Sequence, residues 1–161
     1  MGLLKGLDPL LTADLLYVLR MAGHGDEILV CDANFPAHEV ATKTTSGKLV
    51  TLAGADCIQA TRAICSVLPV DYFVKCPVHY MAPQEGASLP PLGEEVHAAF
   101  FSALAEAGGG DLKVEPIERF RFYEHARGCY AVVQAQSERR PYANFILKKG
   151  VVGPDGKDLK P

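Results

Sequence analysis

Apolar and polar positions along the chain follow two spacings, one typical of helices and one typical of strands. Residues 12–22 carry an apolar stripe at helical spacing, and residues 55–68 and 93–107 are also predicted to be helices. Thr12 and Asp56 stand near the first two starts, where a short polar side chain caps free backbone N–H groups. Pro69 follows the second helix and three glycines close the third.

Short runs rich in valine, isoleucine and aromatic residues alternate with these helices and predict strands. The predicted strands are residues 27–31, 48–52, 71–81 (interrupted at Pro77), 113–117, 129–135 and 143–148. Residues 32–47 and 82–92 are predicted to be irregular, and residues 122–127 a short helix or turn. Helices and strands mix without a repeat or linker. We therefore expect a single three-layer α/β domain, with a mixed, mainly parallel sheet covered by helices. The last two strands are expected to be antiparallel neighbours.

Composition narrows the classes of partner. The 161 residues are 48% hydrophobic and 22% charged, with a net charge of −3 and no basic stripe, so we expect no nucleic acid partner. No apolar run approaches the roughly 20 residues that span a bilayer, and the N-terminus lacks the features of a signal peptide. The five cysteines form no Cys-x-x-Cys pair and are expected to be buried free thiols in a reducing cytoplasm.

The sequence Gly23-His24-Gly25 joins the first predicted helix to the first predicted strand. Histidine exchanges protons near neutral pH, and glycine lets the backbone approach a ligand closely. In the simpler interpretation His24 is a polar loop residue or a helix-dipole partner, and Gly23 is only the helix cap. Asp32 and Asn34 follow the strand, either as hydrogen-bonding groups for sugar hydroxyls or as turn-forming residues.

A metal site is disfavoured by the spacing of its candidate ligands. His24, Asp32 and His38 are separated by eight and six residues, which matches no familiar zinc pattern. His38 is therefore either a second site residue or an ordinary loop residue. The chain also lacks a dinucleotide-binding glycine motif, a Walker loop and a nucleophile elbow, which argues against nucleotide-binding and hydrolase functions.

Two later segments carry further candidates. Arginine and phenylalanine alternate from Arg119 to Phe122, which predicts a half-buried edge strand with its arginines in solvent. In the functional alternative, Arg119 donates hydrogen bonds to a polar ligand and a nearby aromatic ring, with Tyr123 as a candidate, covers an apolar sugar face. The segment Tyr142-Ala143-Asn144 by itself predicts a hairpin turn.

Three separated segments resemble one known family in the same order. LLKGLDPLLTADLLYVLRMAGHGDEILVCDANFPAH at 3–38, RFRFYEHA at 119–126 and PYANFILKKG at 141–150 are similar to the D-ribose pyranase/L-fucose mutarotase family. The resemblance covers about residues 3–152 and is closer to the L-fucose mutarotase branch. Ala143 departs from it, because fucose members often have glycine there, and this leaves the sugar open. The resemblance implies one mutarotase-like domain at residues 1–152, and residues 153–161 are expected to be a flexible tail.

The resemblance also implies an activity and its residues. The family interconverts ring forms or anomers of free monosaccharides without a cofactor. His24 corresponds to the catalytic histidine and Asp32 to a sugar-binding aspartate. Arg119 corresponds to a substrate contact of the fucose branch, where the ribose branch carries histidine, and Tyr142 and Asn144 correspond to a sugar-contacting pair. Ring-shaped homo-oligomers, often decamers, with sites completed across subunit interfaces are implied as well.

The resulting hypothesis is a cofactor-independent isomerase that opens and recloses the ring of L-fucose or a related sugar. The alternatives are a D-ribose pyranase, a non-catalytic sugar-binding protein of a transport system, and an inert scaffold.

One geometric question arises, since His24 and Asp32 are separated by a strand. Eight extended residues span about 26 Å at ~3.3 Å each, more than one monosaccharide can bridge. Either the glycines fold His24 back along the strand, or a neighbouring subunit supplies one of the two residues.

Overall fold

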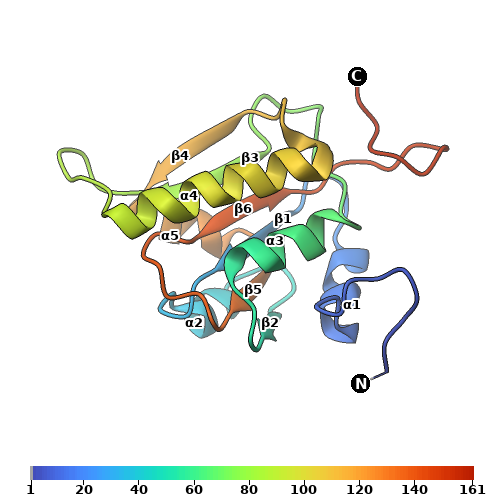
Figure 1. The fold of residues 1–161 in the computed structure, drawn as a ribbon, viewed down its shortest axis with the longest axis horizontal. Coiled ribbons are helices and arrows are strands. Elements are labelled where there is room, and N and C mark those ends of the chain that lie inside the picture. The colour runs from blue at the N-terminus through green and yellow to red at the C-terminus, as the bar shows by residue number, and fades with distance from the viewer. Residues whose placement is uncertain (1) are drawn as a thin grey trace.

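A six-stranded sheet forms the centre of the computed structural model, which describes residues 2–161 (Figure 1). The elements in chain order are α1 (Ala13–Met21), β1 (Glu27–Cys31), α2 (Ala37–Ala41), β2 (Leu49–Leu52), α3 (Cys57–Cys65), β3 (Val78–Ala82), α4 (Pro91–Leu104), the π-helical turn η1 (Ala105–Gly109), β4 (Val114–Glu118), α5 (Arg119–Arg127), β5 (Ala131–Ala135) and β6 (Phe145–Lys148).

The strand order is β2-β5-β1-β6-β3-β4, and β6 alone runs against the other five strands. The predicted mixed, mainly parallel sheet is confirmed. The prediction that the last two strands pair with each other is wrong, because β1 lies between them: Ile28 is in register with Ala131 of β5 and with Leu147 of β6. A strand that is apolar on both faces is best buried in the middle of a sheet.

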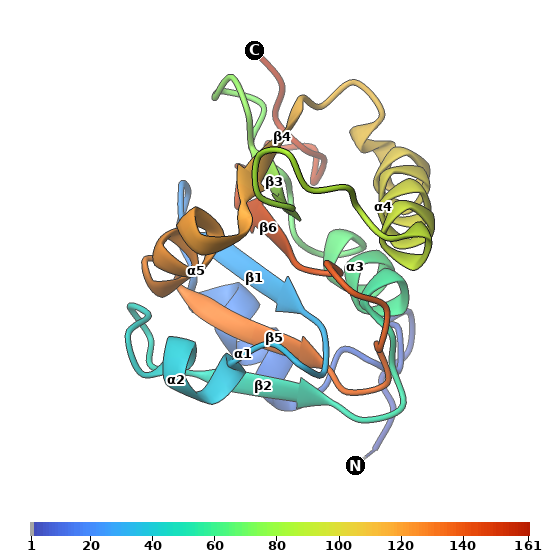
Figure 2. The ribbon, with the colours of Figure 1, turned by 90° about the vertical axis from the view of Figure 1, so that its left-hand side faces the viewer.

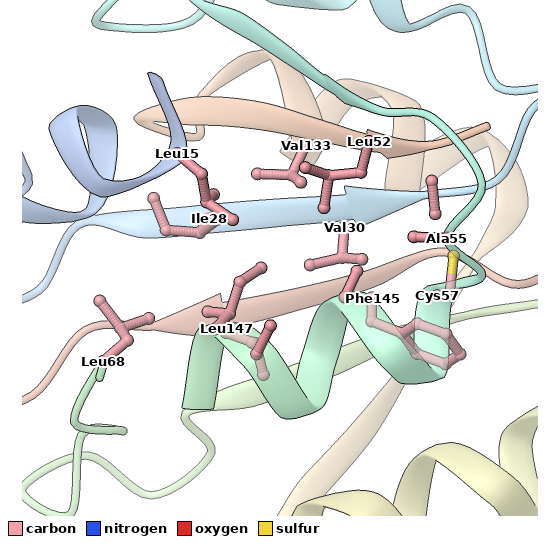
Figure 3. Close-up of a cluster of buried hydrophobic side chains, with 14 of the residues drawn as sticks. Leu15, Ile28, Val30, Leu52, Ala55, Cys57, Leu68, Val133, Phe145 and Leu147 are labelled. Atoms are coloured by element: carbon pink, nitrogen blue, oxygen red, sulfur yellow. The ribbon is translucent and has the colours of Figure 1, made fainter. Parts of the chain in front are cut away.

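Helices cover both faces of the sheet, as the three-layer expectation required (Figure 2). On one face, α1, α3 and α4 pack on a cluster that includes Ile28, Val30 and Phe145, drawn in Figure 3. On the other face, α2 and α5 pack on Leu29 and Ile146. Successive strand residues point to opposite faces, so a strand buried on both sides is a continuous apolar run.

Both predicted helix caps are present. The Thr12 hydroxyl accepts a hydrogen bond from the Leu15 N–H, and Asp56 forms a reciprocal capping box with Gln59. Gly23 is not a left-handed cap, because α1 ends with Ala22 in an extended conformation. The left-handed glycine of this loop is Gly25, with φ 88°.

Three predictions of secondary structure are wrong. The segment predicted to be irregular contains the short helix α2. The predicted strand 71–81 starts only at Val78, after a bend. The predicted edge strand at Arg119 is the start of α5, because the Glu118 carboxylate accepts hydrogen bonds from the N–H groups of Phe120 and Arg121 and caps a helix. Phe122 is then buried while both arginines stay exposed.

The remaining expectations concern the cysteines, the C-terminal segment and membranes. All five cysteines are free, but Cys65 and Cys76 are only half-buried, so the expectation of complete burial is wrong for these two. In the C-terminal segment 153–161, Asp158 pairs with Val152 in an isolated antiparallel β-bridge. The flexibility of this segment stays a prediction. Within residues 2–161, every helix is too short or too polar to cross a bilayer.

Candidate functional site

A cavity of about 210 Å³ lies where β1, β3 and β4 end and β6 begins. Its lining residues are Asp32, Asn34, Phe35, Met81, Arg119, Tyr123, Pro141, Tyr142 and Asn144. The carboxyl ends of parallel strands are the usual position for a ligand site in an α/β sheet. The fold therefore brings together six residues that the sequence and the family resemblance singled out: Asp32, Asn34, Arg119, Tyr123, Tyr142 and Asn144.

Asp32 and Asn144 form the buried polar centre of this cavity. The Asn144 amide donates to the Asp32 carboxylate at 2.9 Å, and the Asp32 N–H donates to the Asn144 side-chain oxygen at 3.1 Å. The second carboxylate oxygen accepts the Asn34 N–H at 2.9 Å. Burial raises the pKa of Asp32, although these hydrogen bonds oppose the shift. The result is a rigid set of hydrogen-bonding groups of the kind that fixes sugar hydroxyls.

Aromatic and cationic groups surround that centre. Arg119 donates from Nε to the Tyr123 hydroxyl at 3.4 Å, and this hydrogen bond raises the pKa of Arg119. Tyr142 adopts φ 63°, the one left-handed non-glycine conformation among residues 2–161. Such backbone strain is common at functional sites. Phe35 and Met81 are apolar lining residues that the sequence interpretation missed, because each reads as an ordinary core residue.

A larger, more open hollow of about 480 Å³ lies beside this cavity, between α2 and α5. It shares Tyr123 with the cavity, but the other predicted site residues do not line it. Three of its four charged side chains, Glu39, Glu124 and Arg127, pair with one another. The smaller cavity is therefore the candidate ligand site.

His24 lies elsewhere, at the amino end of β1, where it contacts Asp71. The two side chains meet at 3.2 Å between Nε2 and Oδ2; the histidine is 51% exposed and the aspartate 1%. The other oxygen of Asp71 accepts the Phe73 N–H, and the Phe73 ring lies edge-on to His24 at 6.1 Å. A buried carboxylate therefore orients a histidine that solvent or a ligand can reach. The sequence interpretation missed Asp71, because it stood at the start of a predicted strand.

The loops that carry this pair are clamped by the end of β6. The Gly25 N–H donates to the Lys149 carbonyl, and the Asp71 N–H donates to the Lys148 carbonyl. A side chain at Gly150 would lie 2.5 Å from the Val70 carbonyl oxygen, so only glycine allows the close approach. His24 is thus fixed at the end of β1 opposite to Asp32, and the idea that the glycines fold it back is wrong.

The remaining candidates are not part of this assembly. His38 is exposed on α2 and does not line the cavity. The possible ligand set of His24, Asp32 and His38 is not brought together, and no group of three ligating side chains within residues 2–161 is placed to hold a metal ion.

Comparison with known proteins identifies the family. Residues 5–152 match the RbsD / FucU transport protein family. The chain belongs to this family. It is 39% identical over 149 residues to the L-fucose mutarotase of Glaesserella parasuis, with 92% of this chain and 96% of that relative covered.

Two solved structures extend this finding. The fucose mutarotase of Streptococcus pneumoniae in complex with L-fucose is 30% identical, with a TM-score of 0.81 over 93% of this chain and all of that one. RbsD of Bacillus subtilis in complex with D-ribose has a TM-score of 0.67 at 19% identity over 94% of this chain and all of that one, and shares the fold. The expected membership of this family is confirmed.

A separate polar cluster of this RbsD/FucU chain joins α5 to the sheet. The Glu27 carboxylate accepts from His125 at 2.7 Å and from Lys148 at 2.9 Å. Burial alone would raise the pKa of Glu27, but the two hydrogen bonds outweigh it and lower the pKa to about 2. The same hydrogen bond raises the pKa of His125. The geometry is that of a structural ion pair between two layers.

Proposed function

We propose that this chain is a monosaccharide mutarotase that interconverts the α and β anomers of L-fucose or a related sugar. The observation that carries the proposal is the pairing of a sugar-sized polar cavity with a histidine held by a buried carboxylate. The cavity is smaller than the roughly 300–1,000 Å³ of sites for drug-sized ligands. The fucose mutarotases among its relatives support the choice of reaction.

The two parts of the site meet in an assembly of several copies. Since His24 and Asp32 lie at opposite ends of β1, we propose that the His24–Asp71 pair of one copy completes the cavity of a neighbouring copy. Exposed apolar rings support this arrangement at both places: Phe73 beside His24 is 48% exposed, and Phe120 beside Arg119 is 55% exposed. Exposed apolar groups that form a contiguous patch commonly mark an interface, and Val74 extends the exposed surface at Phe73. A decameric ring in the cytoplasm, implied by the family resemblance, belongs to the same proposal.

The reaction needs two proton transfers. One group takes the proton of the anomeric hydroxyl while another donates a proton to the ring oxygen, and the bond between C1 and that oxygen breaks. Rotation about the C1–C2 bond and reversal of the two transfers close the ring on the other face. His24 donates from Nε2 to Asp71, which leaves Nδ1 free to exchange a proton with the sugar. Asp32, Arg119 and Asn144 hold hydroxyl groups, and the Tyr142 phenol supplies a second proton position.

Two other functions keep specific support. A D-ribose pyranase would use the same cavity, but Arg119 stands where the ribose branch carries histidine by resemblance, which favours L-fucose. A non-catalytic sugar-binding protein would use the Asp32 cavity alone, since His24 lies outside it in the isolated chain.

Saturation-transfer NMR of anomer exchange, run in parallel on L-fucose, D-ribose and D-galactose, tests the proposal. We expect the wild type to accelerate exchange of L-fucose most strongly and His24→Ala to lose ~10²–10⁴-fold in rate. His38→Ala is the matched control, because this exposed histidine does not line the cavity. Equal exchange in the wild type and His24→Ala would contradict the assignment of His24. Sugar binding by the wild type without exchange would establish the binding function instead.

A further inference from the structure

His97 of α4 is a buried polar side chain that the proposed mechanism does not use. It is 6% exposed, and its Nε2 lies 3.0 Å from the carbonyl oxygen of Tyr142. We propose that His97 is a positioning residue, which holds Tyr142 in its left-handed conformation and thereby places Tyr142 and Asn144 for sugar binding. This inference rests on the proposed function, because it concerns the same cavity.

The hydrogen bond has a fixed direction. A carbonyl oxygen only accepts, so the His97 proton must be on Nε2. Burial lowers the pKa of His97, with the carbonyl partly opposing the shift, so the ring stays neutral at neutral pH. Aromatic rings enclose it: Tyr80 at 4.9 Å and Phe145 at 5.9 Å between centroids, both edge-on. Packing and burial therefore leave His97 one orientation and one role, that of a neutral donor.

Tyr142 needs such a donor because its backbone conformation is unfavourable. A φ of 63° brings the Cβ of any residue except glycine into close contact with its own backbone. Without the hydrogen bond the carbonyl would be free to rotate away and relieve this strain. The Tyr142 ring would then move out of the cavity, because the directions of the carbonyl and of the side chain depend on the same backbone angles.

The neighbouring residues receive similar support from the same layer. A Cβ on Gly93 of α4 would lie 3.3 Å from the Pro141 carbonyl oxygen, so the helix packs directly on the turn. The Cys57 thiol of α3 donates to the Ala143 carbonyl at 3.1 Å. His97 is thus the central of three contacts from α3 and α4 that fix the backbone from 141 to 143, just before Asn144.

The test compares variants that keep or remove the donor. His97→Phe keeps an aromatic ring in an aromatic environment but removes the N–H, and we expect KM for L-fucose to rise about tenfold, equivalent to about 1.4 kcal/mol. We expect kcat to fall as well, because the displaced Tyr142 phenol supplies the second proton position, although His24 and Asp71 are untouched. His97→Gln offers an amide N–H at a similar reach and should restore KM to within about twofold. Phe101→Leu is the matched control, since it loosens the same aromatic cluster without removing the donor and should lower Tm while leaving KM unchanged.

Several outcomes would overturn the inference. An unchanged KM in His97→Phe would do so, as would an equal rise in His97→Phe and His97→Gln. Should His97→Phe fail to fold, His97→Asn replaces it, because its amide is too short to reach the carbonyl. If the wild type acts on no sugar, the proposed function fails, and crystal structures of the variants decide about His97 separately. Tyr142 should leave the left-handed region in His97→Phe and keep it in Phe101→Leu, and a φ near 63° in both would contradict the role of His97.

Discussion

The two ends of β1 present different chemistry, although they belong to one buried five-residue strand. At the carboxyl end, Asp32 and Asn144 are buried and bind each other through two hydrogen bonds. At the amino end, His24 is half exposed and only its partner Asp71 is buried. In the proposed function, the carboxyl end holds the sugar in one orientation, and the amino end exchanges a proton with the sugar bound by a neighbouring copy.

This difference supports the proposal that neither end is a complete site by itself. The cavity has no histidine among its lining residues. The His24–Asp71 pair, in turn, lines none of the pockets described for residues 2–161. β1 itself keeps the two apart, because its apolar side chains lock it between β5 and β6. A second copy of the chain provides the simplest way to bring the ends together.

The largest expected effect is a difference in kinetic behaviour between matched substitutions at the two ends of β1. Asp71→Asn keeps the shape at the amino end but removes the charge that orients His24, so we expect kcat to fall ~10²-fold with little change in KM. Asp32→Asn at the carboxyl end should chiefly raise KM, because one of its sugar-holding groups changes. Each variant is the control for the other, with rates taken from anomer exchange of L-fucose. The same pattern of change in both variants would break the distinction between the ends.

A smaller effect concerns the Glu27 cluster, which lies at the amino end of β1 but includes neither His24 nor Asp71. The pKa of Glu27 is about 2 in the folded chain, below its ordinary 4.5, so its contribution is complete above pH 4.5 and is lost as pH falls toward 2. The pKa of His125 is raised above 6.5, so its contribution is complete below pH 6.5 and is lost as pH rises through the raised pKa. The ion pair is therefore strongest between these limits.

Glu27→Gln tests this assignment. We expect the free energy of unfolding to fall by about 2 kcal/mol near pH 6, and the difference from the wild type to shrink as the pH falls below 4.5. Denaturant titrations at several pH values measure it. Because the cluster contains none of the proposed site residues, KM and kcat of the folded variant should stay close to wild type. A selective loss of kcat would place Glu27 in the catalytic machinery instead.

Local signals in the sequence predicted the frame of the fold well. Thr12 and Asp56 are caps because a short polar side chain before an apolar stripe has one favourable use. The apolar run of β1 predicted a buried strand. The start of α5 was predicted to be a strand because four residues of alternating arginine and phenylalanine are compatible with the period of a strand and with that of a helix. The Glu118 cap, which decides for the helix, lies just before these four residues.

Contacts between distant segments were beyond local signals. Asn144 binds Asp32 across 112 residues, and Asp71 reaches His24 across 47. The family resemblance supplied Asn144, whereas Asp71 stood in no segment that carried the resemblance. The order of strands, which sets these contacts, depends on which apolar run is buried on both faces and not on proximity in sequence.

Mixed oligomers of two inactive variants test the central claim most directly. His24→Ala lacks the proton-transfer group and Asp32→Ala lacks a buried sugar-holding group, so each, assembled alone, should show little exchange at L-fucose concentrations well below the raised KM of Asp32→Ala. If one copy supplies His24 to the cavity of another, randomly mixed assemblies of equal amounts should recover about one quarter of wild-type exchange of L-fucose, because one site in four then combines both intact parts. Exchange that stays at the level of the separate variants after verified mixing would contradict a site shared between copies.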